Sequence, residues 1–503
     1  MELLLPLTIV IPVAGAIIIA RSKTLQTSLR ALRIAMFSFV AATAACVVLL
    51  ATQEGTEIAL FEFLPEVPLY FRVDLVSILF SLLTVAMWLG STLFSFDYLS
   101  HGEREDRYDI FSLLALGALM GVCFSGNLVT TYIFYEMMTL ATFPLVMHEQ
   151  TKEAVSAGMT YLYYSLAGAF LGLVGIFFLY TYAAPATRTG GVVSYVAGGF
   201  LNYGTDSTGL QVAVFLMLVG LGSKVGMFPL HGWLPKAHPV APAPASALLS
   251  GNITKMGILF IIRVVYYSVG PQYLWRTWMQ TALLTLVLIT IFLGSMLAFR
   301  EKVMKKRLAY STVSQTSYIL AGIYLCCNVG TAATGAILHI VFHSVIKNLL
   351  FLCAGAVIYK TGKTRVEEWK GLGRQMPVTM TAFTIGGLAL VGIPPLAGFV
   401  SKWQLATGAL DTGLPYFEYL VPAMLLVSAL LTAGYLMGPA ADAWFVAKSE
   451  ESGGEKCEVS WRMLVPLCVL AAAAILFGLF PKELTDFANY LVDTVMTFSF
   501  PVK

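Results

Sequence analysis

Long apolar runs separated by short polar segments follow one another along the chain. Most of these runs are about 17 to 25 residues long, the length that an α-helix needs to cross a lipid bilayer. The pattern therefore predicts an all-α polytopic membrane protein with about fourteen transmembrane helices. The predicted spans cover residues 3–20, 31–51, 74–97, 109–125, 127–147, 157–182, 211–230, 242–267, 277–299, 308–327, 331–358, 378–408, 419–446 and 461–480.

Two of the predicted spans are interrupted by helix-breaking residues beside a lysine. The interrupting residues are Gly222-Ser-Lys224 with Pro229 in one run, and Gly392-Ile-Pro394-Pro395 with the following Lys402 in the other. Each proline frees a backbone carbonyl that can bind water near the lysine, although a simple kink is the alternative. The two breaks lie in the seventh and twelfth predicted spans, five positions apart, so they have opposite orientations. Inverted repeats with matching interrupted helices are how many transporters build a site near the middle of the membrane.

Composition supports one integral membrane unit rather than several soluble domains. Hydrophobic residues make up 58% of the chain and charged residues 12%, whereas soluble domains carry about 25% charged residues. The net charge of +3 is too small to indicate a nucleic-acid partner. The seven cysteines form no CxxC pair, so no zinc or iron–sulfur spacing is present and no metal site is predicted. The first run lacks the flanks of a signal peptide and is expected to be a retained span.

Basic loops set the expected orientation in the membrane. Alternate loops of the fourteen-span arrangement carry the excess of lysine and arginine, which the positive-inside rule assigns to the cytoplasm. Both termini are then expected outside, in the inner membrane of a prokaryotic-type cell. The basic segments are 21–33, 300–307 and 360–374, whereas the loop at 54–66 carries four glutamates.

Several charged side chains lie inside the predicted spans. An ionisable group at the middle of a bilayer costs about 2.5 to 3.5 kcal/mol even on the lenient insertion scale, so such groups usually face a wet interior and mark an ion pathway. The sequence therefore predicts proton or cation translocation. The groups expected to carry it are Glu136, Lys224, Lys255, His339, His343, Lys347 and Lys402.

Glu136 and Lys224 are expected to act as a pair. Glu136 is the carboxylate deepest in its span, and it can act as a counter-charge that keeps Lys224 protonated. Loss of the pair would favour the neutral amine, so the lysine could pass a proton. The alternative is a static salt bridge that joins two helices, although such a bridge in lipid is a poor stabiliser.

Three titratable groups share one face of the span at 331–358. His339, His343 and Lys347 follow one another at intervals of four residues, and each step turns the face by only about 40°. This spacing favours a relay across the protein. Core histidines satisfied by hydrogen bonds are one alternative, and haem or metal ligation is another.

Five further residues are secondary candidates. Arg263 lies near the outer end of its span and either takes part in the pathway or extends its charged end to the interface. Asp74 opens the third span and is either a helix cap or a partner for an inner charge. His231, Lys236 and His238 lie in the loop after the first break, where they form either the cytoplasmic intake for protons or a solvated loop.

Three motifs resemble one known family. They are Pro229-Leu-His-Gly-Trp-Leu-Pro-Lys-Ala-His-Pro-Val-Ala-Pro with Ser246-Ala-Leu-Leu-Ser-Gly-Asn-Ile-Thr-Lys255, then Leu338-His-Ile-Val-Phe-His-Ser-Val-Ile-Lys-Asn-Leu-Leu-Phe-Leu, and Gly392-Ile-Pro-Pro-Leu-Ala-Gly-Phe-Val-Ser-Lys402. They resemble the antiporter-like subunits of respiratory complex I, membrane-bound hydrogenases and Mrp-type multisubunit sodium/proton antiporters. The resemblance covers residues 70 to 445.

The resemblance implies two inverted five-helix repeats and a central hydrophilic axis along the membrane. It implies that Glu136 and Lys224 are the glutamate–lysine pair, that Lys255 is the bridging lysine, and that Lys402 is the terminal lysine of the second repeat. His339, His343 and Lys347 correspond to the middle of the axis. The implied organisation is an N-terminal three-helix segment at 1–108, repeats at 109–267 and 277–446, and a loop, last span and short tail at 447–503.

The resemblance also narrows the subtype. One complex I subunit type carries glutamate in place of Lys402, and the largest type adds a long lateral helix, whereas this chain stops shortly after its last span. A D-type Mrp subunit or its hydrogenase counterpart is therefore expected.

The expected function is translocation of protons, with sodium antiport as a variant, inside a complex of related antiporter-like and small membrane subunits in the lipid bilayer. No catalytic site or cofactor is expected in this chain, and iron–sulfur clusters or flavin would belong to partner subunits. The alternatives are an autonomous secondary carrier and a quinone- or haem-binding redox subunit.

Overall fold

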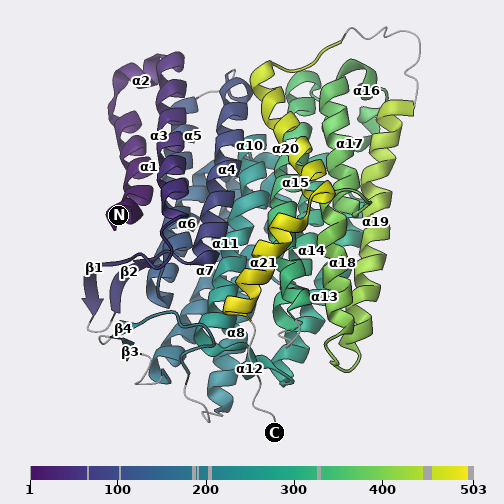
Figure 1. The fold of residues 1–503 in the computed structure, drawn as a ribbon. Coiled ribbons are helices and arrows are strands. Elements are labelled where there is room, and N and C mark those ends of the chain that lie inside the picture. Colours follow the sequence, from purple (N-terminus) through teal and green to yellow (C-terminus); the bar gives the residue numbers. More distant parts are fainter. Residues whose placement is uncertain are drawn as a thin grey trace.

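A computed structural model describes residues 2–64, 67–100, 104–183, 188–189, 192–201, 207–325, 330–445 and 456–496. Helices that stand side by side make up nearly all of it (Figure 1). The short helices α2 (Lys23–Thr27) and α16 (Leu372–Gln375), which belong to the basic segments of the sequence, lie at the same end of the bundle. The predicted all-α polytopic fold is confirmed. The predicted loop at 447–460 falls largely outside the described residues.

Eleven helical segments in the described part of the chain are long and apolar enough to cross a membrane. They are α1 (Leu4–Arg21), α3 (Leu29–Leu50), α4 (Leu75–Tyr98), α5 (Glu105–Phe124), α7 (Lys152–Thr181), α8 (Thr208–Val225), the continuous segment Ala243–Val269, α13 (Trp278–Arg300), α15 (Thr331–Thr361), α19 (Phe417–Phe445) and α20 (Trp461–Leu479).

The other three predicted spans are helical but do not meet this criterion, so the count of fourteen is not confirmed. α6 (Leu128–Val146) and α14 (Met304–Leu325) have spanning length but contain more polar residues, including three basic residues in the first turn of α14. The twelfth span consists of two short helices, α17 (Pro377–Val391) and α18 (Ala397–Leu410), on either side of its break.

Short elements connect the long helices. Two antiparallel hairpins, which the sequence reading did not predict, lie at the end opposite α2 (Figure 1). The first hairpin pairs Glu57 with Arg72. These connecting elements are β1 (Glu57–Leu64), β2 (Val67–Arg72), β3 (Arg188–Thr189), β4 (Val192–Val193), α9 (Leu234–Val240), α12 (Pro271–Leu274) and the 3₁₀ turn η4 (Val366–Trp369).

The eighth predicted span changes its helical pitch twice. It consists of α10 (Ala243–Leu248), the π-helix η2 (Leu249–Ile253), α11 (Thr254–Ile262) and the π-helix η3 (Arg263–Val269). π-Helical turns inside an α-helix free or shift backbone carbonyls and are frequent at functional sites.

The centre of the bundle is formed by that segment and by α15. The most apolar 18-residue window of each is fully buried, whereas about a third of the corresponding window is buried in α1, α19 and α20. A helix that is apolar on all sides is stable only where neighbouring helices surround it. The two central helices carry Lys255, His339, His343 and Lys347, so the fold places these groups inside the protein.

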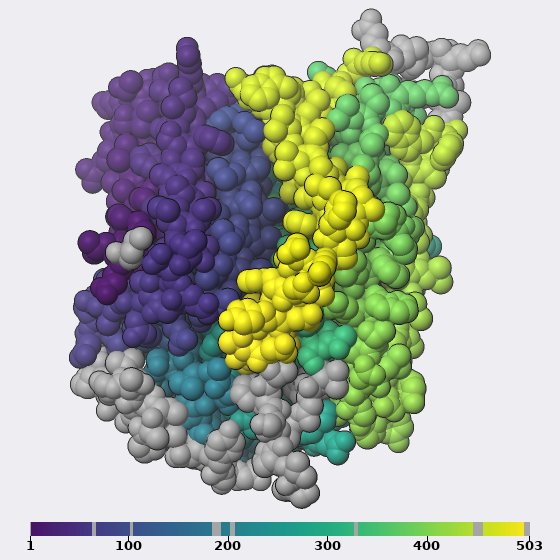
Figure 2. Space-filling view, in the orientation of Figure 1, coloured from purple at the N-terminus to yellow at the C-terminus, as the bar shows by residue number. Residues whose placement is uncertain are grey.

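The chain ends its described part with α21 (Lys482–Val495), which follows α20 across the front of the bundle (Figure 2). Its residues Ala488, Leu491 and Val492 are buried, and Thr334 of α15 donates to its Asn489 at 2.8 Å. Residues after the last predicted span therefore form a packed amphipathic helix.

Candidate functional site

Lys224 lies in a cage of hydroxyl groups near the end of α8. Its side chain is fully buried, and its Nζ donates to Thr139 Oγ1 at 2.8 Å, Tyr161 OH at 2.9 Å and Ser165 Oγ at 3.0 Å. Nζ also lies 4.5 Å from the centre of the Tyr161 ring. An ammonium group offers three donors, so α6 and α7 together satisfy all of them.

Glu136 and Lys224 do not form a direct ion pair in this structure, but Glu136 lies close enough to interact electrostatically with the lysine, so its expected role as a counter-charge stays a prediction. No carboxylate of the described residues lies within 4.0 Å of Lys224, and Glu136 Oε1 is buried without a hydrogen-bond partner. The reason is geometric, because Thr139 lies one turn beyond Glu136 on the same helix and occupies the position nearest the amine. Glu136 is half-buried on a flank where Met137 and Leu140 are exposed.

The first helix break follows directly after Lys224. Gly226 adopts φ 89° and ends α8, and the N–H groups of Gly226 and Met227 both donate to Gly222 O, at 2.9 and 2.8 Å. This is the usual way in which a glycine ends a helix. The Phe228–Pro229 peptide is cis, and the Phe228 N–H donates to Thr290 Oγ1 at 2.9 Å.

Lys255 and His343 are in direct contact at the centre of the protein. Lys255 Nζ lies 2.6 Å from His343 Nδ1 and donates to Ser250 O at 2.7 Å. Ser250 belongs to the π-helix η2, so the change of pitch presents a carbonyl to the lysine. The structure therefore brings the predicted bridging lysine and the predicted histidine relay together.

His339 links His343 to residues beside the second helix break. The rings of His343 and His339 are 5.8 Å apart, and His339 Nδ1 lies 2.9 Å from Ser401 Oγ. Tyr318 of α14 stacks on His339, with ring centres 5.5 Å apart. The Nζ atom of Lys402 lies 5.2 Å from the centre of the same Tyr318 ring. Tyr318 thus joins the histidines of α15 to the lysine of α18.

Lys402 binds the backbone that the second break exposes. Its Nζ donates to Leu390 O at 2.6 Å and Val391 O at 3.0 Å, the last carbonyls of α17. The prediction that a break would leave carbonyls free is confirmed here, although the lysine itself occupies them. Gly392 has φ 91°, and the Pro394–Pro395 peptide is cis.

Lys347 points toward the end of the bundle that carries the basic loops. It donates to Leu308 O at 3.0 Å and to Ser311 Oγ of α14. One turn further along α15, Phe351 stacks on His238 with ring centres 4.6 Å apart. His238 is fully buried, and neither ring nitrogen has a hydrogen-bond partner among the described residues.

The segment after the first break is not the predicted loop throughout, because Lys236 and His238 belong to the short helix α9, and it is not uniformly solvated. Lys236 is exposed, His231 is half-buried, and His238 is buried. The interpretation of this loop as an entirely solvated segment is therefore wrong. Whether it takes up protons stays a prediction.

Asp74 and Arg263 form a buried pair, so the interpretation that Arg263 only extends to the interface is wrong. Arg263 is 1% exposed and donates to both carboxylate oxygens of Asp74, at 2.6 and 2.9 Å. Its guanidinium lies over the Tyr267 and Tyr195 rings. Asp74 also caps α4 in a capping box with Ser77, so both interpretations of Asp74, as a cap and as a partner, are correct.

Sequence reasoning missed one lysine and most of the hydroxyl partners. Lys305 was assigned to a basic loop, but it is 6% exposed and donates to Pro239 O at 3.1 Å and to Ala241 O beside His238. Tyr161 and Ser165 are four residues apart on α7, and this spacing was the available signal for a polar helix face.

A family model described as NADH:quinone oxidoreductase/Mrp antiporter, transmembrane, matches residues 125–432. This match covers more than half of the chain and includes both helix breaks. The chain belongs to this antiporter-like family.

Other antiporter-like proteins match the chain over much of its length. NADH-quinone oxidoreductase subunit N of Desulforudis audaxviator is 33% identical over 76% of this chain and 75% of the relative. Hydrogenase-4 component B of Escherichia coli is 32% identical over 68% of the chain, and Na(+)/H(+) antiporter subunit A1 of Staphylococcus haemolyticus is 29% identical over 86%. The chain spans only 51% and 56% of the length of these two relatives.

Solved structures show the same antiporter-like fold. A chain of the archaeal membrane-bound sulfane sulfur reductase has a TM-score of 0.85 at 23% identity and covers 99% of this chain and 98% of its own length. A chain of the Mrp complex from Dietzia sp. DQ12-45-1b has a TM-score of 0.83 at 22% identity, with the same coverage. The relatives come from several kinds of complex, so the expected D-type or hydrogenase subtype stays a prediction.

Proposed function

We propose that this chain is the proton-translocating subunit of a multisubunit membrane complex, in which Lys224, Lys255, His343, His339 and Lys402 carry the proton. The observation that carries the proposal is the row of contacts from Lys255 through His343, His339 and Tyr318 to Lys402. Family membership supports it, because relatives are named as subunits of an oxidoreductase, a hydrogenase and a sodium/proton antiporter.

The partners of the buried lysines favour transport over a structural role. Within the described residues, no carboxylate lies within 4.0 Å of Lys224, Lys255, Lys347 or Lys402. A structural ion pair in lipid needs its counter-charge nearby, and hydroxyl and carbonyl groups do not supply one. An extra proton is then expected to be shared along the contacts, because a charge held at one buried group is costly.

The proposed route runs from the end with the basic loops toward the opposite end. A proton enters near Lys236 and His238, reaches the axis at Lys224 or Lys347, passes through Lys255 and the histidines, and leaves from Lys402. Lys305 lies beside His238 and belongs to the intake side. Buried atoms without protein partners, such as His343 Nε2 and the side-chain amide of Gln315, are sites that water usually satisfies.

Partner subunits are expected on the flank that contains Glu136. Glu136 is a half-buried ionisable residue beside exposed Met137 and Leu140, and such a residue would be costly next to lipid at this depth. Related antiporter-like and small membrane subunits would cover it in a cell membrane with both termini outside. Either a redox reaction at iron–sulfur or flavin groups of partner subunits or a sodium gradient would drive the protons. Iron and flavin assays of the native complex would distinguish the two.

The test is proton translocation by the native complex with Lys255→Ala. In inverted membrane vesicles, a pH-sensitive dye should show translocation reduced by about a hundredfold, with the complex still assembled. Lys302→Ala, which removes an exposed lysine paired with Glu367, is the matched control and should leave translocation unchanged. Wild-type translocation by assembled Lys255→Ala would overturn the proposal, and full activity of the lone chain in liposomes would favour an autonomous carrier.

A further inference from the structure

We propose that the groove between α3, α4 and α20 binds the phosphate headgroup and one acyl chain of an anionic phospholipid. The groove has a volume of about 690 Å³, and its lining includes Arg30, Arg33, Phe37, Phe96, Trp461 and Arg462. It is far from the proposed proton route in sequence, and it lies at the end of the bundle where α2 is found (Figure 1).

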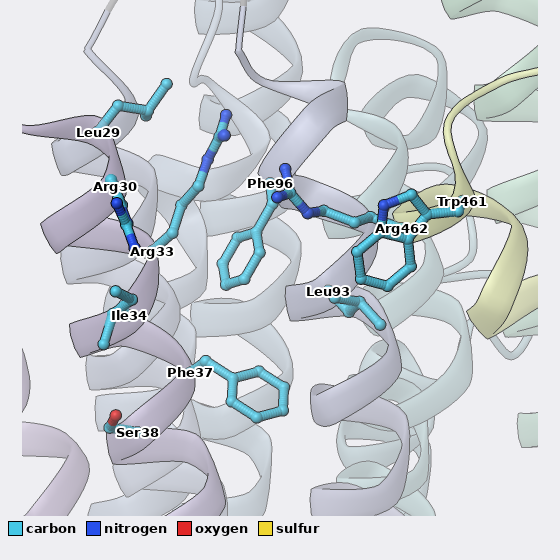
Figure 3. A pocket seen from close by; sticks show the side chains of 10 residues that line it. All are labelled: Leu29, Arg30, Arg33, Ile34, Phe37, Ser38, Leu93, Phe96, Trp461 and Arg462. Atoms are coloured by element: carbon cyan, nitrogen blue, oxygen red, sulfur yellow. The ribbon is translucent and has the colours of Figure 1, made fainter.

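Positive charge gathers in one part of this groove. Figure 3 shows the guanidinium groups of Arg33 and Arg462 above the Phe96 ring, with Arg30 nearby on α3. Of the described carboxylates, only Asp97 lies within ion-pair distance of these groups, at 3.1 Å from Arg462 and 3.9 Å from Arg33. Buried Asp109 also interacts electrostatically with Arg33 without forming an ion pair. Only one of the three guanidinium groups can be fully paired with Asp97, so the groove presents guanidinium donors that direct ion pairs leave unneutralised.

Arg33 carries the clearest sign of an absent acceptor. Its Nε and Nη2 atoms are buried, and neither has a hydrogen-bond partner among the described residues. A guanidinium group presents its donors as a planar fork that fits two phosphate oxygens. A phosphate in the groove would satisfy both atoms while Nη1 stays near Asp97.

The rest of the groove is apolar. Phe37 and Leu93 lie below the guanidinium groups in Figure 3. Ile34 is 59% exposed and Phe37 39% exposed, so these side chains present an uncovered apolar surface. Trp461, 64% exposed at the start of α20, is the residue type found at the level of lipid headgroups. Charge above and hydrocarbon below matches a phospholipid rather than a free anion.

Basic pockets between transmembrane helices on the cytoplasmic side are suited to anionic headgroups. The α3 and α20 helices come from distant parts of the sequence, and α4 lies between them. A bound lipid would therefore join the N-terminal segment to the last span, and its phosphate would be shared by arginines of both.

Native mass spectrometry of the delipidated full-length protein with phosphatidylglycerol or phosphatidylcholine tests this proposal. Wild type should retain phosphatidylglycerol with an affinity at least about tenfold above that for phosphatidylcholine. The variant Arg30→Ala/Arg33→Ala/Arg462→Ala should lose that preference. The control Arg104→Ala/Arg276→Ala/Lys302→Ala removes three exposed charges elsewhere and should keep it.

A second readout does not depend on the stability of the triple variant. Brominated phosphatidylglycerol should quench the tryptophan fluorescence of wild type more than that of Trp461→Phe, and brominated phosphatidylcholine should show no such difference. Equal loss of binding in both triple variants, or full displacement of the lipid by millimolar inorganic phosphate, would overturn the proposal. So would exclusion of phosphatidylglycerol from the groove in the intact complex by a partner subunit.

Discussion

The two helix breaks use the same backbone turn but hold their lysines differently. In each, a glycine with positive φ ends the helix, the N–H groups of the glycine and of the residue after it donate to one carbonyl, and a cis proline peptide follows at the third residue after the glycine. Lys224 lies two residues before its glycine and is held by side-chain hydroxyls, whereas Lys402 lies ten residues after its glycine and is held by main-chain carbonyls. The two breaks thus share the turn, while the lysines lie on opposite sides of it along the chain.

This difference separates two kinds of environment for a buried amine. At ten residues after Gly226, the position that corresponds to Lys402 is Lys236, which is exposed on α9. The first break therefore has one buried and one exposed lysine, and the second has a single lysine beside its carbonyls. On the proposed route, the first arrangement would serve proton uptake from water, and the second would serve delivery to the far side of the protein.

The largest effect is expected at the residue between the two breaks. His343→Leu removes the imidazole that contacts Lys255 at 2.6 Å, so protons from the first break should no longer reach the second. Translocation in vesicles should fall by about a hundredfold, as is typical when a proton-transfer group is removed. His343→Gln keeps a polar side chain and should retain more activity than His343→Leu. Equal wild-type rates for both would show that the breaks work without this link.

A smaller effect is expected at Tyr318, which touches both His339 and Lys402. Tyr318→Leu removes the ring, and translocation should fall by about tenfold because the cation–π contact with Lys402 is lost. Tyr318→Phe keeps the ring and should remain within about threefold of wild type. The same loss in both variants would assign the effect to the hydroxyl group instead.

The hydroxyl cage of Lys224 offers a test that the second break does not. Tyr161→Phe removes one of three hydroxyl partners, which should cost about 1 kcal/mol and slow translocation by about fivefold. The carbonyl partners of Lys402 are main-chain atoms and cannot be removed in this way. Measurement of Tyr161→Phe against Thr139→Ala and Ser165→Ala would show whether the three hydroxyl acceptors contribute equally. No effect from any of them would contradict a role for the cage.

The glycines should respond differently to the same substitution. At Gly226 and Gly392, alanine must adopt a positive φ, which costs about 1 to 2 kcal/mol in stability. A new Cβ at Gly226 would also overlap buried Leu234, whereas at Gly392 it would meet Lys402 Cδ at 2.9 Å. Thermal unfolding in detergent should therefore show the larger loss for Gly226→Ala. Gly392→Ala should chiefly slow translocation, and the reverse order would contradict this account.

Much of the architecture could be predicted because lipid imposes it. Apolar runs of spanning length and intramembrane charges are visible in the sequence, and they indicated the helical bundle and most of the buried basic groups. Interactions that depend on distant helices were not visible. The hydroxyls around Lys224, the bidentate pair of Asp74 with Arg263, and the burial of Lys305 each require two or more helices to be placed first.

The most direct test of the central claim is the number of protons translocated per turnover in Lys224→Ala and Lys402→Ala, each in the assembled native complex. If the two breaks lie on one route, each single variant should lose nearly all translocation through this chain, and the double variant should be no worse than the singles. If each break instead serves a route of its own, each single variant would keep about half of the protons, and only the double variant would lose them all. That second result would contradict the account.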